Sequence, residues 1–443
     1  MDVPATTPNI IFILTDDLDK ATLEAPLDRM PNIKSLIADQ GATFDNFYVS
    51  ESMCCPSRAT ILTGEYVHNH GVEDNDAPDG GFAKFRDMGH EERTIAAHLK
   101  PLGYATGLFG KYLNDYGPQT DSSTHVPPHW DRWFATFNQK RYRWRVNDDG
   151  TETRYGKAPS DYSDNVIGEK ARSFISDGEA ESPFFAFVAP HAPHGPLEDP
   201  PDHTTEFADE TAPRNPNFDE AEVSDKPEYV SKQPFLTDDE KREIDQNYPH
   251  RLRMLLAVDD MVGAIVNDLE AAGDLDSTYI FVTSDNGLMQ GEHRRAGAKH
   301  NPYEEASHVP LLVRGPGITP GTRISELTLN TDFFATFADM AGEAADRDGR
   351  SLLPLLNGDT PTSWRNQLHL ENPGSYYVIR TERYKYVEWD DGDTELYDLQ
   401  NDPYELQSTH ADADSALVED LKAKLQALKS CAGQSCREAE DAI

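Results

Sequence analysis

The stretch Asn9-Ile-Ile-Phe-Ile-Leu-Thr-Asp-Asp17 decides the fold class of this 443-residue chain. Its apolar residues follow one another without the apolar and polar alternation of a half-solvated strand. A continuous run of this length is typical of a strand that is buried on both faces, as in a parallel sheet. Runs of the same kind occur at 184–189, 278–282 and 309–313, and each ends abruptly in small or polar residues.

Helical periodicity lies between these runs, at 31–40, 164–176 and 251–272. Strands that alternate with helices predict an α/β domain, in which a large, mostly parallel sheet is sandwiched by helices. Residues 199–239 differ, because they are rich in Pro, Asp and Glu and poor in apolar residues. We interpret them as a long surface excursion, at the rim of a site.

The pattern changes after residue 360. Three short strands are expected at 376–380, 384–388 and 395–399, with a hairpin turn at 390–393. A closing amphipathic helix is expected at 415–430. These elements predict a small α+β subdomain with a short antiparallel sheet. The sequence therefore predicts two domains, a catalytic α/β domain at 1–360 and an α+β subdomain at 361–443.

The chain is strongly acidic, with 79 Asp and Glu residues against 40 Lys and Arg residues and a net charge of −39. This balance argues against nucleic acid or an anionic membrane surface as a partner, since both require a basic face. No apolar run approaches the roughly 20 residues of a membrane span. The first residues show neither a basic nor an apolar signal-peptide region, so the chain is either cytosolic or a trimmed mature form.

Two of the four cysteines, Cys431 and Cys436, have a spacing that can close a small loop. We interpret them as a disulfide, with two free thiols on a frayed tail as the alternative. A disulfide favours an oxidising compartment, so a secreted or periplasmic location is expected, with a cytoplasmic one left open.

Acidic residues follow two of the predicted strands at their carboxyl ends. Asp16 and Asp17 follow the first strand, and Asp285 and Asn286 follow another. In an open α/β sheet, ligands bind beyond the carboxyl ends of the strands. Converging oxygen donors would repel one another without a cation, and hard oxygen ligands select Ca²⁺ or Mg²⁺. The alternative is that each Asp only caps the following turn or helix.

The segment Met53-Cys-Cys-Pro-Ser-Arg-Ala-Thr-Ile-Leu-Thr-Gly64 places a thiol at the start of a predicted helix. Arg58, about one turn further on, would hold an anion there. From the residues alone, the cysteine is either a reactive thiolate or a buried structural residue.

This segment resembles the motif of the type I sulfatases of the alkaline phosphatase superfamily, which is Cys-x-Pro-Ser-Arg followed by four residues and Thr-Gly. The resemblance extends over about residues 9–406. The motifs are most similar to those of the sulfatases that act on N-acetylglucosamine-6-sulfate groups. Other matching segments, in family order, are Thr15-Asp-Asp17, Phe109-Gly-Lys-Tyr-Leu-Asn114, Ala192-Pro-His-Gly-Pro196, Ser284-Asp-Asn-Gly287, Val309-Pro-Leu-Leu-Val-Arg-Gly-Pro316 and Glu395-Leu-Tyr-Asp-Leu-x-x-Asp-Pro-x-Glu405.

The resemblance implies that a separate formylglycine-generating enzyme oxidises Cys54 to formylglycine. One hydroxyl of the hydrated aldehyde then attacks sulfur, and the other expels sulfate, so that covalent catalysis divides the reaction into two steps. A divalent cation is implied, Ca²⁺ by family habit and Mg²⁺ or Mn²⁺ as alternatives. Its implied ligands are Asp16, Asp17, Cys54, Asp285 and Asn286.

The resemblance also assigns roles to basic residues. Arg58 would anchor the hydrated aldehyde, and Lys111 and Lys299 would bind sulfate oxygens. His194 would protonate the leaving alcohol, with His191 as its rival.

The sequence departs from the family at Leu113, where many sulfatases carry a histidine. Asn114 either takes over that role or another residue does. His293 is expected to face the substrate or to be an ordinary loop histidine, and the same choice applies to His68 and His70. The three tryptophans that could stack on a sugar or aryl ring are more typical of core packing: Trp130, Trp133 and Trp144.

The sequence thus predicts a sulfuric ester hydrolase that acts on a sulfated sugar or an aryl sulfate. The enzymatic alternative is a phosphonate or phosphate ester hydrolase of the same superfamily. A more distant alternative is a non-enzymatic, acidic, calcium-binding protein.

Overall fold

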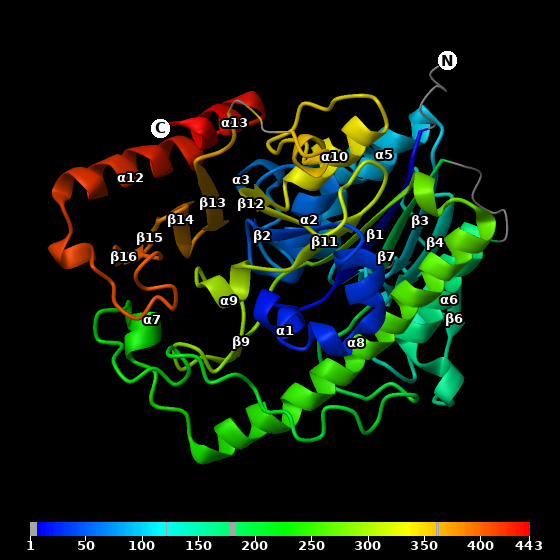
Figure 1. Ribbon diagram of the computed structural model, residues 1–443, viewed down its shortest axis with the longest axis horizontal. Coiled ribbons are helices and arrows are strands. Elements are labelled where there is room, and N and C mark those ends of the chain that lie inside the picture. The colour runs from blue at the N-terminus through cyan, green and yellow to red at the C-terminus, as the bar shows by residue number, and fades with distance from the viewer. Residues whose placement is uncertain (1–6, 121, 177–182, 360, 362) are drawn as a thin grey trace.

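A computed structural model describes residues 7–120, 122–176, 183–359, 361 and 363–443. Its main feature is a ten-stranded sheet at the centre of the molecule (Figure 1). From one edge to the other, the strands are β12 (Thr322–Leu329), β2 (Ala42–Tyr48), β11 (Leu311–Arg314), β8 (Thr278–Ser284), β1 (Asn9–Thr15), β7 (Phe184–Ala189), β3 (Ala105–Gly110), β4 (Arg132–Thr136), β5 (Arg145–Asp148) and β6 (Thr151–Arg154).

The middle of this sheet, from β8 through β1, β7 and β3 to β4, is parallel. The last two pairs, β4 with β5 and β5 with β6, are antiparallel. On the other side, β11 runs antiparallel to both β8 and β2. The predicted fold class, a large and mostly parallel sheet with helices, is therefore confirmed, with antiparallel strands added on both flanks.

Strand β1 is buried on both faces, as its sequence predicts. Phe12 packs on one face among residues of α2 (Cys54–Thr63), α5 (Ile95–Leu99) and α10 (Asp332–Met340). Ile11 and Ile13 pack on the other face against α6 (Ser163–Ser176) and α8 (Asp238–Ala272). Successive side chains of a strand point to opposite faces, so a strand between two helical layers must be apolar throughout.

Helix α8 begins 13 residues before the predicted start at 251 and runs diagonally across one side of the molecule (Figure 1). Thr237 caps it, since its hydroxyl accepts from Glu240 N and the Glu240 carboxylate accepts from Thr237 N. These two reciprocal contacts form a capping box. The preceding excursion forms turns and bends at 199–227, then the short helix α7 (Glu228–Ser231).

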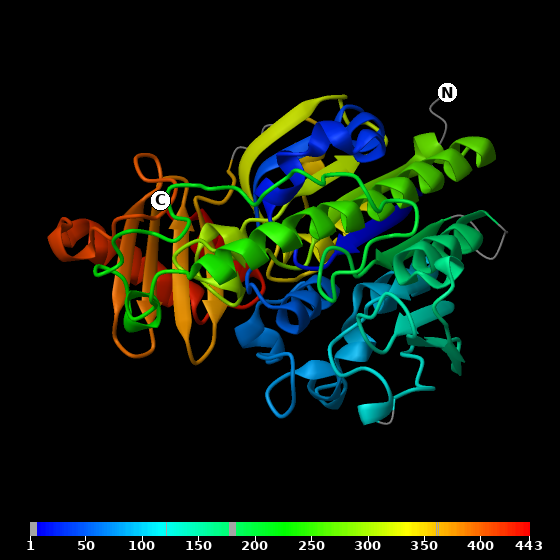
Figure 2. The same ribbon diagram turned by 90° about the horizontal axis from the view of Figure 1, so that it is seen from below.

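A second, four-stranded antiparallel sheet lies at one end of the molecule (Figure 2). Its strands are β13 (Gln367–Asn372), β14 (Tyr376–Thr381), β15 (Tyr384–Trp389) and β16 (Thr394–Asp398). Helices α12 (Ser415–Leu428) and α13 (Gln434–Asp441) pack against it, and Cys431 and Cys436 form the expected disulfide between them. The antiparallel sheet and closing helix of the predicted subdomain are confirmed.

The remaining α-helices and strands of the described residues, and one π-helical segment, are short. They are α1 (Lys20–Glu24), a π-helical segment Ile33–Ala38, α3 (Val67–His70), α4 (Gly81–Asp87), α9 (Glu304–Ser307), α11 (Leu353–Leu356), β9 (Met289–Gln290) and β10 (Ala296–Ala298). None of the helices in the described part of the chain has the length and apolar character that a membrane crossing requires.

Candidate active site

The candidate site lies at the carboxyl ends of three parallel strands. Thr15 and Ser284 pair at the ends of β1 and β8, so Asp16 and Asp285 leave the sheet side by side. Lys111 follows β3 in the same way. Helix α2 points its N-terminus at this edge and begins at Cys54. The fold therefore brings together residues that are more than 200 positions apart in the chain.

Three carboxylates and three cations face one another here, and all except Lys299 are almost fully buried. Lys111 Nζ lies 2.7 Å from Asp16 Oδ2, and Arg58 Nε lies 2.7 Å from Asp285 Oδ2. Burial opposes ionisation of Asp16, but the charges of Lys111 and other neighbours outweigh it and hold its pKa well below the usual range. Asp16 is therefore ionised at neutral pH, whereas burial raises the pKa of Asp285.

Lys299 joins this cluster to the thiol. Its Nζ lies 2.6 Å from Asp17 Oδ1 and 2.8 Å from Cys54 Sγ, and Cys54 Sγ lies 3.5 Å from Asp16 Oδ1. Burial nevertheless raises the pKa of the Cys54 thiol to about 12. A cysteine acts as a nucleophile in its thiolate form, so the burial of Cys54 argues against a thiolate as the reactive group, although Lys111 and Lys299 favour one.

The oxygen donors fit a hard divalent cation. Atoms of Asp16, Asp17, Cys54 and His194 that could each ligate a metal lie within 4.8 Å of one another. Asn286 Nδ2 donates to Asp17 Oδ1 at 2.6 Å, whereas Asn286 Oδ1 is buried and has no hydrogen-bond partner within the described chain. Carboxylates together with an unpartnered amide oxygen match the oxygen ligands that Ca²⁺ and Mg²⁺ take.

The backbone at Asp17 contributes to this convergence. Its φ angle is 64°, a left-handed conformation that is uncommon outside glycine but accessible to Asp. Arg251 of α8 holds the turn by donating to Asp17 O at 2.6 Å. Sequence reasoning did not identify Arg251, because an arginine inside a helical pattern carries no signal of this contact.

The two candidate general acids differ in their surroundings. His194 is partly exposed, and its Nε2 lies 3.6 Å from Asp17 Oδ2. His191 is fully buried, and its Nε2 lies 3.0 Å from Thr136 Oγ1. Burial, and then the charge of Arg141, lowers the pKa of His191 well below its usual value, so this imidazole is neutral. A neutral buried imidazole is the weaker candidate for a proton donor.

A cavity of about 160 Å³ opens beside the charged cluster. Lys111, Asn114 and His191 contribute to its wall, as does Gln139. Gln139 Nε2 donates to Asp16 Oδ2 at 3.2 Å, so it belongs to the site although sequence reasoning missed it. It lies in a stretch, 117–155, where the resemblance to known motifs is weakest.

The structure does not bring His293 to this cluster. Its ring is fully buried, with Nδ1 2.6 Å from Glu220 Oε2, and it stacks on Tyr303. The expectation that His293 faces the substrate is therefore not supported by its position, because a carboxylate and an aromatic ring already surround the imidazole. His70 is also buried, against Thr60 and His90. The core packing expected of the tryptophans is confirmed: Trp130, Trp133 and Trp144 are all buried.

Comparisons with known proteins agree with this geometry. Residues 8–343 match a family model described as sulfatase, and 291–431 match one described as N-sulphoglucosamine sulphohydrolase, C-terminal. The N-acetylglucosamine-6-sulfatase of Homo sapiens is 33% identical over 475 aligned residues, which cover 97% of this chain and 86% of that protein. The N-acetylglucosamine-6-O-sulfatase of Bacteroides thetaiotaomicron is 28% identical and covers 92% of this chain and 84% of its own.

One solved structure similar to this chain holds a protein in complex with its substrate, D-glucosamine-2-N,6-O-disulfate. It has a TM-score of 0.80 and 25% identity, and the match covers 98% of this chain and 99% of that one. A phosphonate monoester hydrolase from Silicibacter pomeroyi shares the fold, with a TM-score of 0.74, 24% identity, and coverage of 94% and 93%.

Proposed function

The chain belongs to the sulfatase family, and from this premise we propose that it releases sulfate from the 6-position of N-acetylglucosamine 6-sulfate, using a formylglycine formed at Cys54. The names of the relatives at 33% identity support this substrate. So does the glucosamine disulfate bound by the structural neighbour. The observation that supports the proposed chemistry most strongly is the position of Cys54, which lies beside Lys299, Asp16 and Asp17 at one edge of the sheet.

Formylglycine at Cys54, once hydrated, supplies the oxygen nucleophile for the sulfur atom. The residues around Cys54 are suited to hold that group in place. Lys299 already contacts the side chain, and Arg58, on the same helix, is locked by Asp285 and by the Lys111 carbonyl oxygen. The side chain at Cys54 also lies at the N-terminus of the ten-residue helix α2, where backbone N–H groups favour an anion.

A divalent cation bound by Asp16, Asp17, Asp285 and Asn286, with the modified Cys54, would lower the pKa of the nucleophilic hydroxyl and neutralise sulfate oxygens. We propose Ca²⁺ for this role. The unpartnered Asn286 Oδ1 and the carboxylates around it support an oxygen-liganded ion.

The remaining roles fall to the basic residues that line the site. Lys111 and Lys299 would bind sulfate oxygens and stabilise the charge that develops on them. His194, which is partly exposed and 3.6 Å from Asp17, would donate a proton to the sugar oxygen as it leaves. Asn114 and Gln139, in the cavity wall, would contact the sugar, and neutral His191 would position it.

We also propose that the protein acts outside the cytoplasm and is matured by a formylglycine-generating enzyme. The disulfide supports an oxidising compartment. The extracellular sulfatases of Drosophila melanogaster and Caenorhabditis elegans, 35% and 34% identical, support the same location.

The experiment compares sulfate release from N-acetylglucosamine 6-sulfate, its 3-sulfate isomer and galactose 6-sulfate. We expect kcat/KM to be highest for the first, because only it combines the proposed sugar with the proposed position. Matched phosphate and phosphonate esters are included, since a phosphonate hydrolase shares this fold. A preference for those esters would contradict the proposal, and a preference for another sulfated sugar would correct its substrate.

A further inference from the structure

A second group of potential ligands lies between the two sheets and outside the site described above. His68 comes from α3, and His369 and Glu371 come from the edge strand β13. His369 and Glu371 are fully buried, and the His68 side chain is 15% exposed. Potential ligand atoms of these three residues all lie within 4.8 Å of one another.

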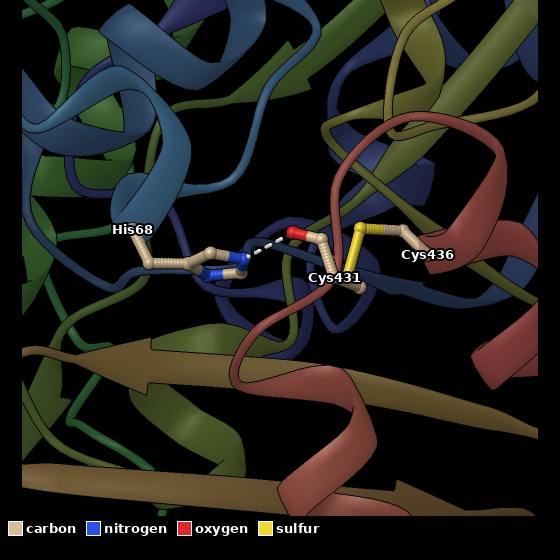
Figure 3. Close-up of side chains that lie close together, drawn as sticks. All are labelled: His68, Cys431 and Cys436. Carbon is tan, nitrogen blue, oxygen red and sulfur yellow. Dashed lines mark hydrogen bonds between the residues drawn. A yellow bond between two sulfur atoms is a disulfide. The ribbon is translucent and has the colours of Figure 1, made fainter.

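Backbone carbonyls determine where the imidazoles carry their protons. His369 Nδ1 lies 3.0 Å from Val378 O, and His68 Nε2 lies 2.9 Å from Cys431 O. A carbonyl oxygen can only accept, so each of these nitrogens must donate. Figure 3 shows the His68 ring directed at the Cys431 carbonyl, beside the disulfide to Cys436.

In the neutral form of each ring the other nitrogen carries a lone pair, and both of these nitrogens face the same carboxylate. Burial opposes protonation of His68, but the Glu371 carboxylate outweighs it and raises the pKa of His68. His68 Nδ1 lies 2.9 Å from Glu371 Oε1, and His369 Nε2 lies 3.5 Å from Glu371 Oε2. Buried His369 Nε2 has no hydrogen-bond partner among the residues that the structure describes. If His68 Nδ1 and Glu371 share one proton, that proton satisfies only these two groups. The lone pair of His369 Nε2 then still faces the carboxylate. A single divalent cation would satisfy all three groups.

We propose that His68, His369 and Glu371 bind one Zn²⁺ ion through His68 Nδ1, His369 Nε2 and the Glu371 carboxylate. Two imidazoles and a carboxylate are a ligand set that zinc accepts, at about 2.0–2.2 Å from each atom. Ligands at those distances in a tetrahedral arrangement lie roughly 3.4 Å apart. The observed separations of 2.9 and 3.5 Å require only small side-chain shifts.

The surroundings support the ion in two further ways. Each imidazole donates its other N–H to a backbone carbonyl, which is how zinc-bound histidines are oriented. The rings are also held by stacking, His68 on Tyr66 and His369 on Tyr377. Nearby, Glu371 N donates to Ser50 O, and the adjacent Glu51 carboxylate is buried with neither oxygen hydrogen-bonded in the described chain. The positive charge of a bound ion would offset the free-energy cost of burying the Glu51 carboxylate.

The ion would connect α3, which follows the helix that carries Cys54, to the edge of the C-terminal sheet. The three residues would leave a fourth position of a tetrahedral ion for water, and His68 is the ligand that is partly exposed. This site shares no residue with the oxygen-rich cation site of the proposed function. Its nitrogen ligands favour zinc, whereas the carboxylate and amide ligands of the other site favour calcium.

The test titrates chelator-treated full-length protein with Zn²⁺ in excess Ca²⁺, which fills oxygen sites without competing for imidazoles. Metal that stays bound through gel filtration is counted by elemental analysis, and Co²⁺ replaces Zn²⁺ to report the coordination geometry in a visible absorption spectrum. We expect one Zn²⁺ per chain and a higher Tm when it is bound.

Variants locate the ion. His369→Ala and Glu371→Gln should lose more than the roughly 10- to 100-fold in Zn²⁺ affinity that loss of an outer contact costs. Asp285→Ala, at the other site, should keep it. So should His129→Ala, which removes a surface imidazole paired with Glu92. Zn²⁺ uptake by His369→Ala equal to that of the unmodified protein would overturn the proposal. If His369→Ala does not fold, the absence of a tetrahedral Co²⁺ spectrum in the unmodified protein would overturn it.

Discussion

Cys54 and Cys55 are adjacent in the chain but lie in different surroundings. Cys54 contacts Lys299 and Asp16, whereas Cys55 lies in the apolar core on the opposite side of the helix start. Burial raises the pKa of the Cys55 thiol to about 12. Of the two cysteines, Cys54 is therefore the one whose side chain faces the charged cluster.

We predict that Cys54→Ala abolishes sulfate release, because no hydrated aldehyde can form. Cys55→Ser should keep most activity, since serine keeps a small side chain at this position. Sulfate release is measured for both variants, with Tm as a check on folding. The assignment is reversed if Cys55→Ser is inactive and Cys54→Ala still turns over.

His194 and Lys111 should respond differently to the leaving group. We expect His194→Ala to lower kcat/KM by about 10²- to 10⁴-fold on a sugar sulfate and much less on nitrophenyl sulfate, whose phenol leaves without protonation. Lys111→Ala should lower kcat/KM by a similar factor on both substrates, because a contact with the sulfate oxygens does not depend on which alcohol leaves. Equal losses on both substrates for His194→Ala would remove it as the acid, and His191 would be tested next.

At the scale of elements, a buried ion cluster connects the C-terminal sheet to the main sheet's helices. Arg365, just before β13, lies 2.6 Å from Asp332 at the start of α10 and 3.0 Å from Glu440 in α13. All three side chains are fully buried. Removing one member would leave uncompensated charge in the interior.

We predict that Arg365→Met destabilises the fold by about 3–5 kcal/mol. The matched control is Arg383→Met, whose partner Asp398 is close to it on the surface, and this change should alter stability little. Denaturant unfolding measures both. Similar midpoints for the two variants would mean that the buried cluster does not hold the sheets together.

The elements differ in how far the sequence alone could predict them. Strand β1 was predictable to the residue, because burial on both faces requires an unbroken apolar run. The direction of β11 was not, since its apolar run at 309–313 reads the same in a parallel or an antiparallel strand. The first turns of α8 could not be predicted from the sequence, because residues between Asp238 and Tyr248 are mostly polar and exposed and show no apolar periodicity. The domain boundary at 360 stays a prediction.

The residues of the candidate site also differ in how far the sequence alone could predict them. Asp16, Asp285, Lys111 and Cys54 were predictable because each follows a strand or begins a helix within a recognisable motif. Gln139 was not, because a single glutamine between strands carries no periodic or motif signal. The burial of His293 depends on Glu220, 73 residues away, and only the folded chain brings the two together.

On the scale of the whole molecule, several carboxylates are buried despite a net charge of −39. Glu220 is one of them: burial raises its pKa to about 8, although Lys226 opposes the shift. The folded state therefore binds the Glu220 proton more tightly than the unfolded chain does. Its stabilising contribution is complete below the unfolded pKa of 4.5 and is lost as pH rises towards about 8.

We predict that Glu220→Gln loses less stability between about pH 5 and pH 9 than the unmodified protein. Its amide keeps the shape of the protonated carboxyl and cannot ionise. Glu222→Gln, two residues along and exposed, serves as the control and should not change the slope. Unfolding midpoints are compared across the pH series, and parallel curves for Glu220→Gln and the unmodified protein would contradict this assignment.

The most direct test of the sulfatase chemistry is the mass of the peptide that contains Cys54. The protein is produced with and without a formylglycine-generating enzyme, and each preparation is assayed for sulfate release. We expect activity to rise in proportion to the fraction of Cys54 found as aldehyde, and protein with only the intact thiol to be inactive. Full activity in a preparation whose Cys54 is entirely unmodified would contradict it.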